Sequence, residues 1–287
     1  REIAERQATD FIEKKSSLQA EAFEAAFGEA SKPATAGLLE SAIAPFLSSK
    51  SGGRAFDFGT LPASKRTMLS DGVAEIEFLV NALRKGDDLK NSVQAEELPA
   101  DQSDMSDAER VRAATMYVLK RDFESAAQIL SPITKSHPDD FAASLLHGMS
   151  LMEISQGGSL DGEALLTAAI AKNPDCVNAW YQRGVCRIAL KKFESAVDDF
   201  TKVVELNSSK LNALVSRAIC FKNLGRYEAA VADLTQAIDG GFPETRVYFL
   251  RESIYRLMKN SVAADNDKAT GLRLVPTDAG SWVSRGL

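Results

Sequence analysis

The stretch Ala-Trp-Tyr-Gln-Arg-Gly-Val at residues 179–185 decides the fold, because its large residue and its arginine recur at a fixed interval. The large residue returns every 34 positions, as Trp180, Leu214, Tyr248 and Trp282. An arginine follows each of them three residues later, as Arg183, Arg217, Arg251 and Arg285. A constant period of this length predicts an array of stacked helical hairpins.

The period places five complete repeats in residues 107–278, with bounds 107–140, 141–176, 177–210, 211–244 and 245–278. The second repeat has 36 residues, because the Phe-Glu-Ser-Ala at 123–126 returns 70 residues later at 193–196. Its two extra residues fit the glycine-rich turn at 157–159, which accepts an insertion without disturbing either helix. Residues 279–287 repeat the start of a sixth hairpin, so we expect the native chain to continue beyond Leu287. Because the sequence opens on Arg1 and not on Met, we also expect the native chain to begin before it.

Residues 1–106 lack the repeat but keep helical spacing of apolar residues. We predict helices over 1–27, 36–47 and 65–84, with a loop near 48–62. Residues 87–106 are acidic and poorly patterned, so we expect a short helix and a linker there. The sequence therefore divides into an N-terminal helical region, 1–106, and a repeat region, 107–278.

The repeats resemble the tetratricopeptide repeat (TPR) family, whose motif places large, small and aromatic residues at set spacings. One repeat follows it through Trp180, Gly184, Phe193, Ala196, Phe200 and Val203, and the next through Leu214, Ala218, Tyr227, Ala230, Leu234 and Ala237. Small residues let paired helices approach closely while large ones fill the space between hairpins. The resemblance implies an all-α protein, a right-handed α-α superhelix (TPR solenoid) preceded by the N-terminal helical region.

Composition narrows the class of partner. Residues 177–287 carry 16 Lys or Arg and 12 Asp or Glu, a net charge of +4, so the first 176 residues carry −10 of the total of −6. Without a basic run or a strongly basic face, a nucleic-acid partner is not expected. No stretch approaches the roughly 20 apolar residues of a transmembrane helix, so membrane insertion is not expected either. Three cysteines without C-x-x-C spacing suit core packing and a reducing, cytoplasmic setting.

No catalytic motif is complete in this sequence. Residues 57–59 read Asp-Phe-Gly, but no kinase glycine-rich loop, V-A-I-K strand or H-R-D-L-x-x-x-N loop accompanies them. His137 and His147 have no second His or Cys at ligand spacing, so we predict no metal site. We predict no catalytic residue, no cofactor and no enzyme activity for this chain.

A regular set of opposite charges marks the later repeats. Three arginines each precede an aspartate by 16 residues, in the pairs Arg183 and Asp199, Arg217 and Asp233, Arg251 and Asp267. A helical hairpin can bring such pairs together. We interpret them as structural ion pairs that align the two helices, and the alternative is a ladder of arginines for a carboxylate ligand.

The TPR resemblance implies that the first helix of each repeat lines a concave face with its second, fifth, ninth and twelfth residues. Apolar residues predominate in the middle of that face, namely Tyr181, Val185, Val215, Ile219 and Phe249. Polar and basic residues form its rim, namely Asn178, Asn212, Lys222, Arg246 and Arg256. An apolar floor with such a rim suits an extended peptide or an amphipathic helix, or the chain's own N-terminal helix.

These observations predict a non-catalytic scaffold that binds a protein or peptide in the concave groove. Two alternatives remain open. The chain could be a structural assembly subunit, or the regulatory tail of a larger enzyme such as a protein kinase, since the repeats also resemble long bacterial TPR tails of multidomain proteins. The partner's identity and the oligomeric state are not determined by the sequence.

Overall fold

The computed structural model describes residues 2–27, 32–47, 56, 61–85, 105–156, 159–242, 244–276 and 279–285. Helices are the only regular elements in these ranges, so the predicted all-α class is confirmed for them. The chain forms two compact units, Arg1–Ala179 and Trp180–Leu287, and each is described by itself. No helix in the described ranges is long and apolar enough to cross a membrane.

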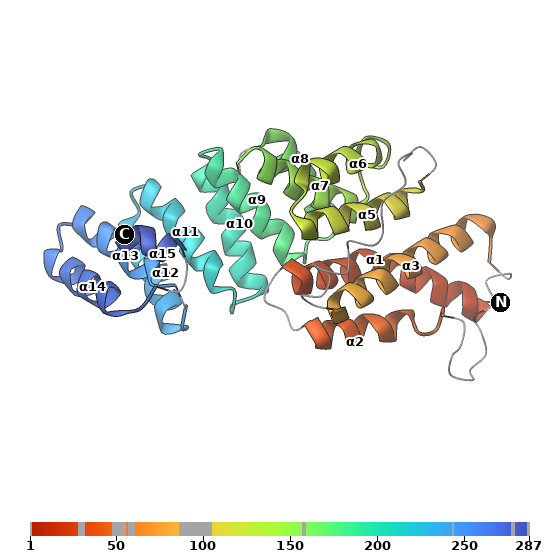
Figure 1. Cartoon of the computed structure of the whole chain (residues 1–287), viewed down its shortest axis with the longest axis horizontal. Coiled ribbons are helices and arrows are strands. Elements are labelled where there is room, and N and C mark those ends of the chain that lie inside the picture. The colour runs from red at the N-terminus through yellow and green to blue at the C-terminus, as the bar shows by residue number, and fades with distance from the viewer. Residues whose placement is uncertain are drawn as a thin grey trace. The chain divides into compact units, whose positions relative to one another are not determined.

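The N-terminal region contains α1 (Glu2–Phe27), α2 (Lys32–Ile43) and α3 (Ala63–Lys85) (Figure 1). The first and third lie where the apolar spacing predicts them, but the expected range of the second, 36–47, was wrong by four residues at each end. Pro33 fits the first turn of α2, where a missing N–H breaks no helical hydrogen bond. Pro45 then ends the helix, because it cannot donate to a carbonyl one turn back.

The acidic segment 87–104 and most of the expected loop at 48–62, including the Asp-Phe-Gly at 57–59, lie outside the described residues.

Helix α1 buries a stripe of residues at spacings of three, four or seven, namely Ala8, Phe11, Leu18, Ala22 and Ala25. It contacts α2 and α3, and also α7 (Phe141–Ile154) of the repeat region. The stripe is crossed by one buried polar cluster, in which Glu75 of α3 accepts from Gln19 Nε2 at 2.8 Å and lies 2.7 Å from Lys15 Nζ. Burial raises the pKa of Glu75, and Lys15 opposes that rise.

The repeat region consists of helix pairs that fall one by one within the five predicted repeat ranges. The pairs are α5 (Asp107–Lys120) with α6 (Phe123–Ser136), α7 with α8 (Leu160–Lys172), α9 (Val177–Ala189) with α10 (Phe193–Leu206), α11 (Leu211–Asn223) with α12 (Tyr227–Asp239), and α13 (Arg246–Leu257) with α14 (Ser261–Arg273). A final helix, α15 (Ala279–Arg285), contacts α13. The domain boundary predicted at residue 106 stays a prediction. The division into two compact units falls within α9, between Ala179 and Trp180.

The turn inside each hairpin repeats one backbone conformation. A residue just after the first helix is left-handed in every hairpin, with φ of 63° at Arg121, 54° at Gln156, 59° at Lys191, 72° at Gly225 and 59° at Lys259. The last three are spaced by the repeat period of 34. A left-handed residue at this place closes the helix and lets the chain reverse. Only one of the five is glycine, which is why turn composition alone does not reveal them.

Close approach of the two helices depends on a small residue facing a large one. A Cβ atom added to Gly184 of α9 would lie 2.8 to 3.1 Å from three ring atoms of Phe200 of α10, whose ring is fully buried. Gly148 stands in the same relation to Leu166 in the second repeat, with a distance of 2.9 Å. The complementary sizes expected from the motif thus set the spacing within these hairpins.

All three cysteines are buried in the packed interior of the protein. Cys186 and Cys220, one period apart, each have no exposed surface. Burial raises the pKa of the Cys220 thiol to about 12, so this side chain stays protonated and packs as a small apolar group.

We expect Gly184→Ala to lower the free energy of unfolding by about 1 to 3 kcal/mol, because the new methyl group overlaps the Phe200 ring. This loss should appear although alanine is favoured over glycine in helices by about 1 kcal/mol. Chemical denaturation of the purified chain measures it. Gly37→Ala in α2, where a new Cβ meets no atom within 4 Å, is the matched control and should raise stability by about 0.5 kcal/mol. An increase for Gly184→Ala would contradict the packing argument.

Candidate partner-binding site

The structure brings part of the predicted concave face of the C-terminal unit into one hollow. Val215 of α11 and both Arg246 and Phe249 of α13 line it. Four residues that the sequence did not single out complete the lining, namely Val247, Leu250, Glu252 and Ser284. The hollow has a volume of about 390 Å³ and mixes apolar walls with charged edges. Three of the residues predicted to bind a partner therefore share one surface.

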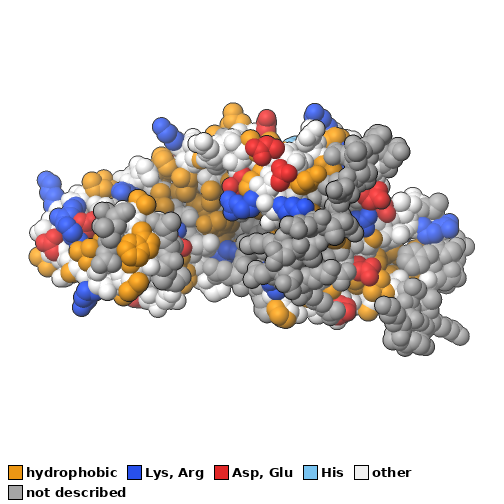
Figure 2. Space-filling view, in the orientation of Figure 1, with side chains coloured by type: hydrophobic (Ala, Val, Ile, Leu, Met, Phe, Trp, Pro, Cys, Tyr) orange, Lys and Arg blue, Asp and Glu red, His pale blue; other side chains and the backbone are white. Residues whose placement is uncertain are grey.

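The rest of the apolar floor is partly accessible. Val185 and Ile219 are half-buried. The ring of Tyr181 meets Phe200 edge to face, with ring centroids 5.6 Å apart, so one side of Tyr181 is fixed by the core while the residue stays partly exposed. Figure 2 shows hydrophobic side chains gathered in a recessed part of the surface around α9, α10 and α11.

The cations of the rim differ in how they are satisfied. Arg246 pairs with Glu244, and Arg256 pairs with Glu252 and also lies 3.2 Å from Asp265. Lys222 donates to Ser253 Oγ at 3.1 Å, and no carboxylate in the described ranges forms an ion pair with it. Each arginine of the rim therefore has an acidic partner within the chain, and the lysine has a hydroxyl instead.

The two asparagines predicted for the rim lie in different units. Asn212 of α11 is half-buried, and its Oδ1 atom is buried without a hydrogen-bond partner. Asn178 is buried and belongs to the N-terminal unit, so it is not placed with the other residues of the face.

The corresponding positions of the first two repeats are closed. All eight are buried, namely Ala108, Val111, Thr115, Val118, Ala142, Leu145, Met149 and Met152. Helix α3 contacts α5, and α1 contacts α7, as Figure 1 shows within this unit. Helices of the chain itself thus cover the first helices of these two repeats. The expectation that the N-terminal helix covers Tyr181, Ile219 and Phe249 stays a prediction.

The arginine and aspartate pairs lie together in all three later repeats. Arg183 donates to Asp199 from Nε and Nη2 at 3.1 and 2.7 Å, and Arg217 donates to Asp233 from the same atoms at 2.8 Å each. Arg251 and Asp267 repeat the arrangement at 2.8 and 2.7 Å. Because the carboxylates are buried and each is engaged by a guanidinium fork, this geometry favours the structural interpretation over a ligand ladder.

Two threonines extend these clasps to the preceding repeat. Arg217 Nη1 donates to Thr201 Oγ1 of α10 at 3.0 Å, and Arg251 Nη1 donates to Thr235 Oγ1 of α12 at 2.8 Å. Sequence reasoning missed both threonines, although they are one period apart and each precedes its arginine by 16 residues. One guanidinium therefore links the two helices of its own repeat and the repeat before it.

Asp199 has a second cation that the spacing did not reveal. Arg187 Nη1 lies 2.9 Å from Asp199 Oδ2, and the carboxylate has no exposed surface. Burial raises the pKa of Asp199, and the two guanidinium groups act in the opposite direction. In the next two repeats, the hydrogen bonds that Arg217 and Arg251 donate to Asp233 and Asp267 raise the pKa of both arginines.

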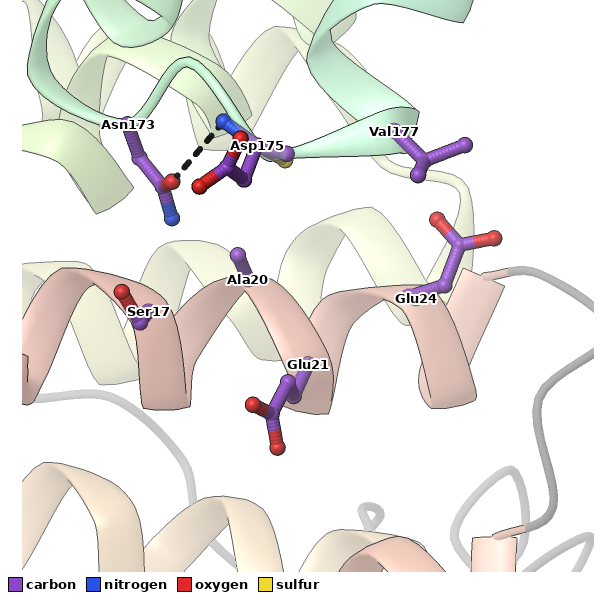
Figure 3. Close-up of a pocket in the computed structure, with 8 residues that line it drawn as sticks. Ser17, Ala20, Glu21, Glu24, Asn173, Asp175 and Val177 are labelled. Carbon is purple, nitrogen blue, oxygen red and sulfur yellow. Dashed lines mark hydrogen bonds between the residues drawn. The ribbon is translucent and has the colours of Figure 1, made fainter. Parts of the chain in front are cut away.

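A separate pocket lies in the N-terminal unit, between α1 and the turn at 173–177 (Figure 3). It has a volume of about 180 Å³, and its lining includes Glu21, Glu24 and Asp175. Asn173 ties the turn together by accepting from the Asp175 backbone at 3.2 Å, and it donates to the Ser16 carbonyl at 3.2 Å. Figure 3 shows the Glu21 side chain directed away from that turn, so the carboxylates do not converge.

Within the described ranges, no group of three or more His, Cys, Asp or Glu could hold a metal ion. His147 is buried with Nδ1 2.9 Å from Thr134 Oγ1, and burial lowers its pKa, so it packs as a neutral side chain. His137 lies 3.5 Å from Asp107 at the surface.

Comparison with known families identifies the later repeats. A profile of the tetratricopeptide repeat family matches residues 177–210, and a second profile of the same repeat matches residues 211–239. Residues 177–239 are tetratricopeptide repeats. Comparison of its sequence with curated proteins gives no match.

Solved TPR structures share this fold. YrrB, described as a TPR protein with an unusual peptide-binding site, is 14% identical, with a TM-score of 0.53 over 62% of this chain and 91% of YrrB. MamA is 16% identical, with a TM-score of 0.51 over 60% of this chain and 94% of MamA. The AMB-1 form of MamA is 20% identical, with a TM-score of 0.52 over 56% and 94%. At these identities the likeness shows the fold, an all-α repeat superhelix.

The clasp of the TPR hairpin can be tested in one repeat. We expect Asp233→Ala to lower the free energy of unfolding by about 3 kcal/mol, because it leaves the half-buried Arg217 without its carboxylate. Thr201→Val, which removes the hydrogen bond between repeats, should lower it by about 1 kcal/mol. Chemical denaturation of both variants and of the double variant measures these values and their coupling. A loss below about 0.5 kcal/mol for Asp233→Ala would indicate an ordinary surface pair instead.

Proposed function

We propose that this TPR chain is a non-catalytic scaffold that binds a protein or peptide partner on the inner face of its C-terminal unit. The observation that carries the proposal is the hollow shared by Val215, Arg246 and Phe249, three residues that the TPR resemblance had assigned to the inner face. Shared apolar walls with a few charged groups at the edge are typical of peptide grooves. The fold is also that of YrrB, which is described as having an unusual peptide-binding site.

The exposure of the inner-face residues supports partner binding on the same surface. Ile219 and Phe249 are half-buried in the absence of a partner, whereas the equivalent positions of the first two repeats are buried by α1 and α3. Covering an apolar residue of the open face stabilises a complex by about 25 cal/mol per Å² of apolar surface removed from water. The open repeats thus retain a driving force for association that the closed repeats have already used.

Paired substitutions test the groove. We expect Val185→Asp/Ile219→Asp to abolish capture of partners from the source extract, because two carboxylates on the floor oppose burial. Leu257→Asp/Val262→Asp is the matched control, since both residues are exposed and lie outside the four inner positions. Capture is quantified by mass spectrometry, after circular dichroism has shown that both variants stay helical. Equal capture by both would contradict groove binding.

A second role, as an assembly subunit, is favoured by one observation. Apolar side chains reach the surface near the C-terminal end of the array, namely Leu272, Leu274, Val275, Trp282 and Val283. Val275 and Val283 are each 76% exposed. Exposed apolar side chains that gather in one patch often mark an interface.

Sedimentation velocity over a concentration series tests the second role. An assembly subunit should self-associate, and Trp282→Ser/Val283→Ser should shift the distribution to the monomer because it removes apolar area from the contact. A chain that stays monomeric at every concentration would contradict it. This result would leave groove binding untouched, because the substituted residues do not line the hollow.

A further inference from the structure

The chain itself shows what kind of element covers the inner face of its repeats. In the N-terminal unit, α3 contacts α5 and α1 contacts α7, and the inner positions of both repeats are buried. Helix α7 also contacts α5, α6 and α8. With neighbours in its own array on the other sides, the remaining side of α7 is filled by a helix rather than by an extended strand.

The covered and open faces differ in charge. The eight inner positions of the first two repeats hold Ala, Val, Leu, Met and one Thr, with no charged residue. In the last two repeats the same positions hold Asn212, Val215, Ile219, Lys222, Arg246, Phe249, Ser253 and Arg256. A helix that covers the open face must therefore match cations as well as an apolar floor.

Of the three cations on this face, one has no ion pair to a carboxylate among the described residues. Arg246 and Arg256 are neutralised by Glu244, Glu252 and Asp265. Lys222 is half-buried and donates to Ser253 Oγ, without an ion pair to any carboxylate in the described part of the chain. An ammonium group that loses water in a complex needs a carboxylate in its place, because burial of an unpaired charge is strongly unfavourable.

We propose that the partner of this face is an amphipathic helix that lays its apolar side on Val215, Ile219 and Phe249 and places a carboxylate against Lys222. The proposal rests on the proposed groove function and adds the conformation and charge of the partner. Val215 and Ile219 are four residues apart on α11, so they lie one above the other. Val215 is 5% exposed and lines the hollow, and Ile219 is half-buried one turn further on. Lys222 follows Ile219 by three residues along the same side.

Selection from a displayed library of random peptides tests this inference. The peptides should be about 15 residues long, enough for four helical turns. The full chain is the bait, and enriched peptides are then synthesised and measured by calorimetry. We expect apolar residues at i, i+3, i+4 and i+7 with Asp or Glu beside them, and a gain of helical circular dichroism on binding. A central proline in the peptide should abolish binding.

Charge reversal identifies the carboxylate contact. We expect Lys222→Glu to weaken the selected peptides about tenfold or more, and a peptide with its acidic residue changed to Lys to regain affinity for that variant. Lys268→Glu is the matched control, because this exposed residue of α14 carries the same charge outside the inner positions. It should leave affinity unchanged.

The outcomes separate the two proposals. Binding that is lost with Val185→Asp/Ile219→Asp but is equal for Lys222→Glu and Lys268→Glu, or that tolerates the central proline, overturns the acidic helix and leaves groove binding standing. Binding that is indifferent to Val185→Asp/Ile219→Asp overturns groove binding itself. Recovery of no peptide overturns both, since an isolated segment is then not what the face recognises.

Discussion

The close approach of two helices within each hairpin is the constraint on which the rest of the structure depends. It exists because a residue without a side chain, such as Gly184, faces a large one, such as Phe200, at van der Waals distance. Gly148 and Leu166 repeat this fit in the second hairpin, and Gly271 and Phe249 repeat it in the fifth. The array, its inner face and its exposed end all follow from that local fit.

Polar contacts fix the relative orientation of the helices that apolar packing holds together. Each buried arginine reaches the aspartate of its own hairpin, and in two repeats it also reaches a threonine of the preceding hairpin. A buried ion pair adds little net stability, because desolvation of both charges offsets their attraction. Its value here is directional: two parallel hydrogen bonds allow one relative position of the two helices, and the threonine relates one repeat to the next.

The same repeat is used in two ways along one chain. In the first two repeats the inner positions are small or apolar and uncharged, and the chain's own helices cover them. In the later repeats those positions keep apolar residues but add Lys222, Arg246 and Arg256, and a hollow remains. The change in composition accompanies the change from an internal packing surface to an accessible one. This contrast, more than the repeat itself, is the physical basis for locating partner recognition in the C-terminal unit.

Local regularity explains what could be predicted from the sequence. The period of 34 residues determined the helix pairs and the partners of Arg183, Arg217 and Arg251, since each is a fixed offset within one hairpin. The inner positions were predicted from the TPR resemblance. The bounds of α2 were missed because apolar spacing does not mark where a proline starts or stops a helix. Contacts at variable offsets needed the tertiary structure: the cover of α1 over α7, the second cation on Asp199 and the entry of Ser284 into the hollow. Helix α1 lies outside the repeats, and Arg187 has no counterpart one period later, where Phe221 stands, so the repeat spacing marks neither contact.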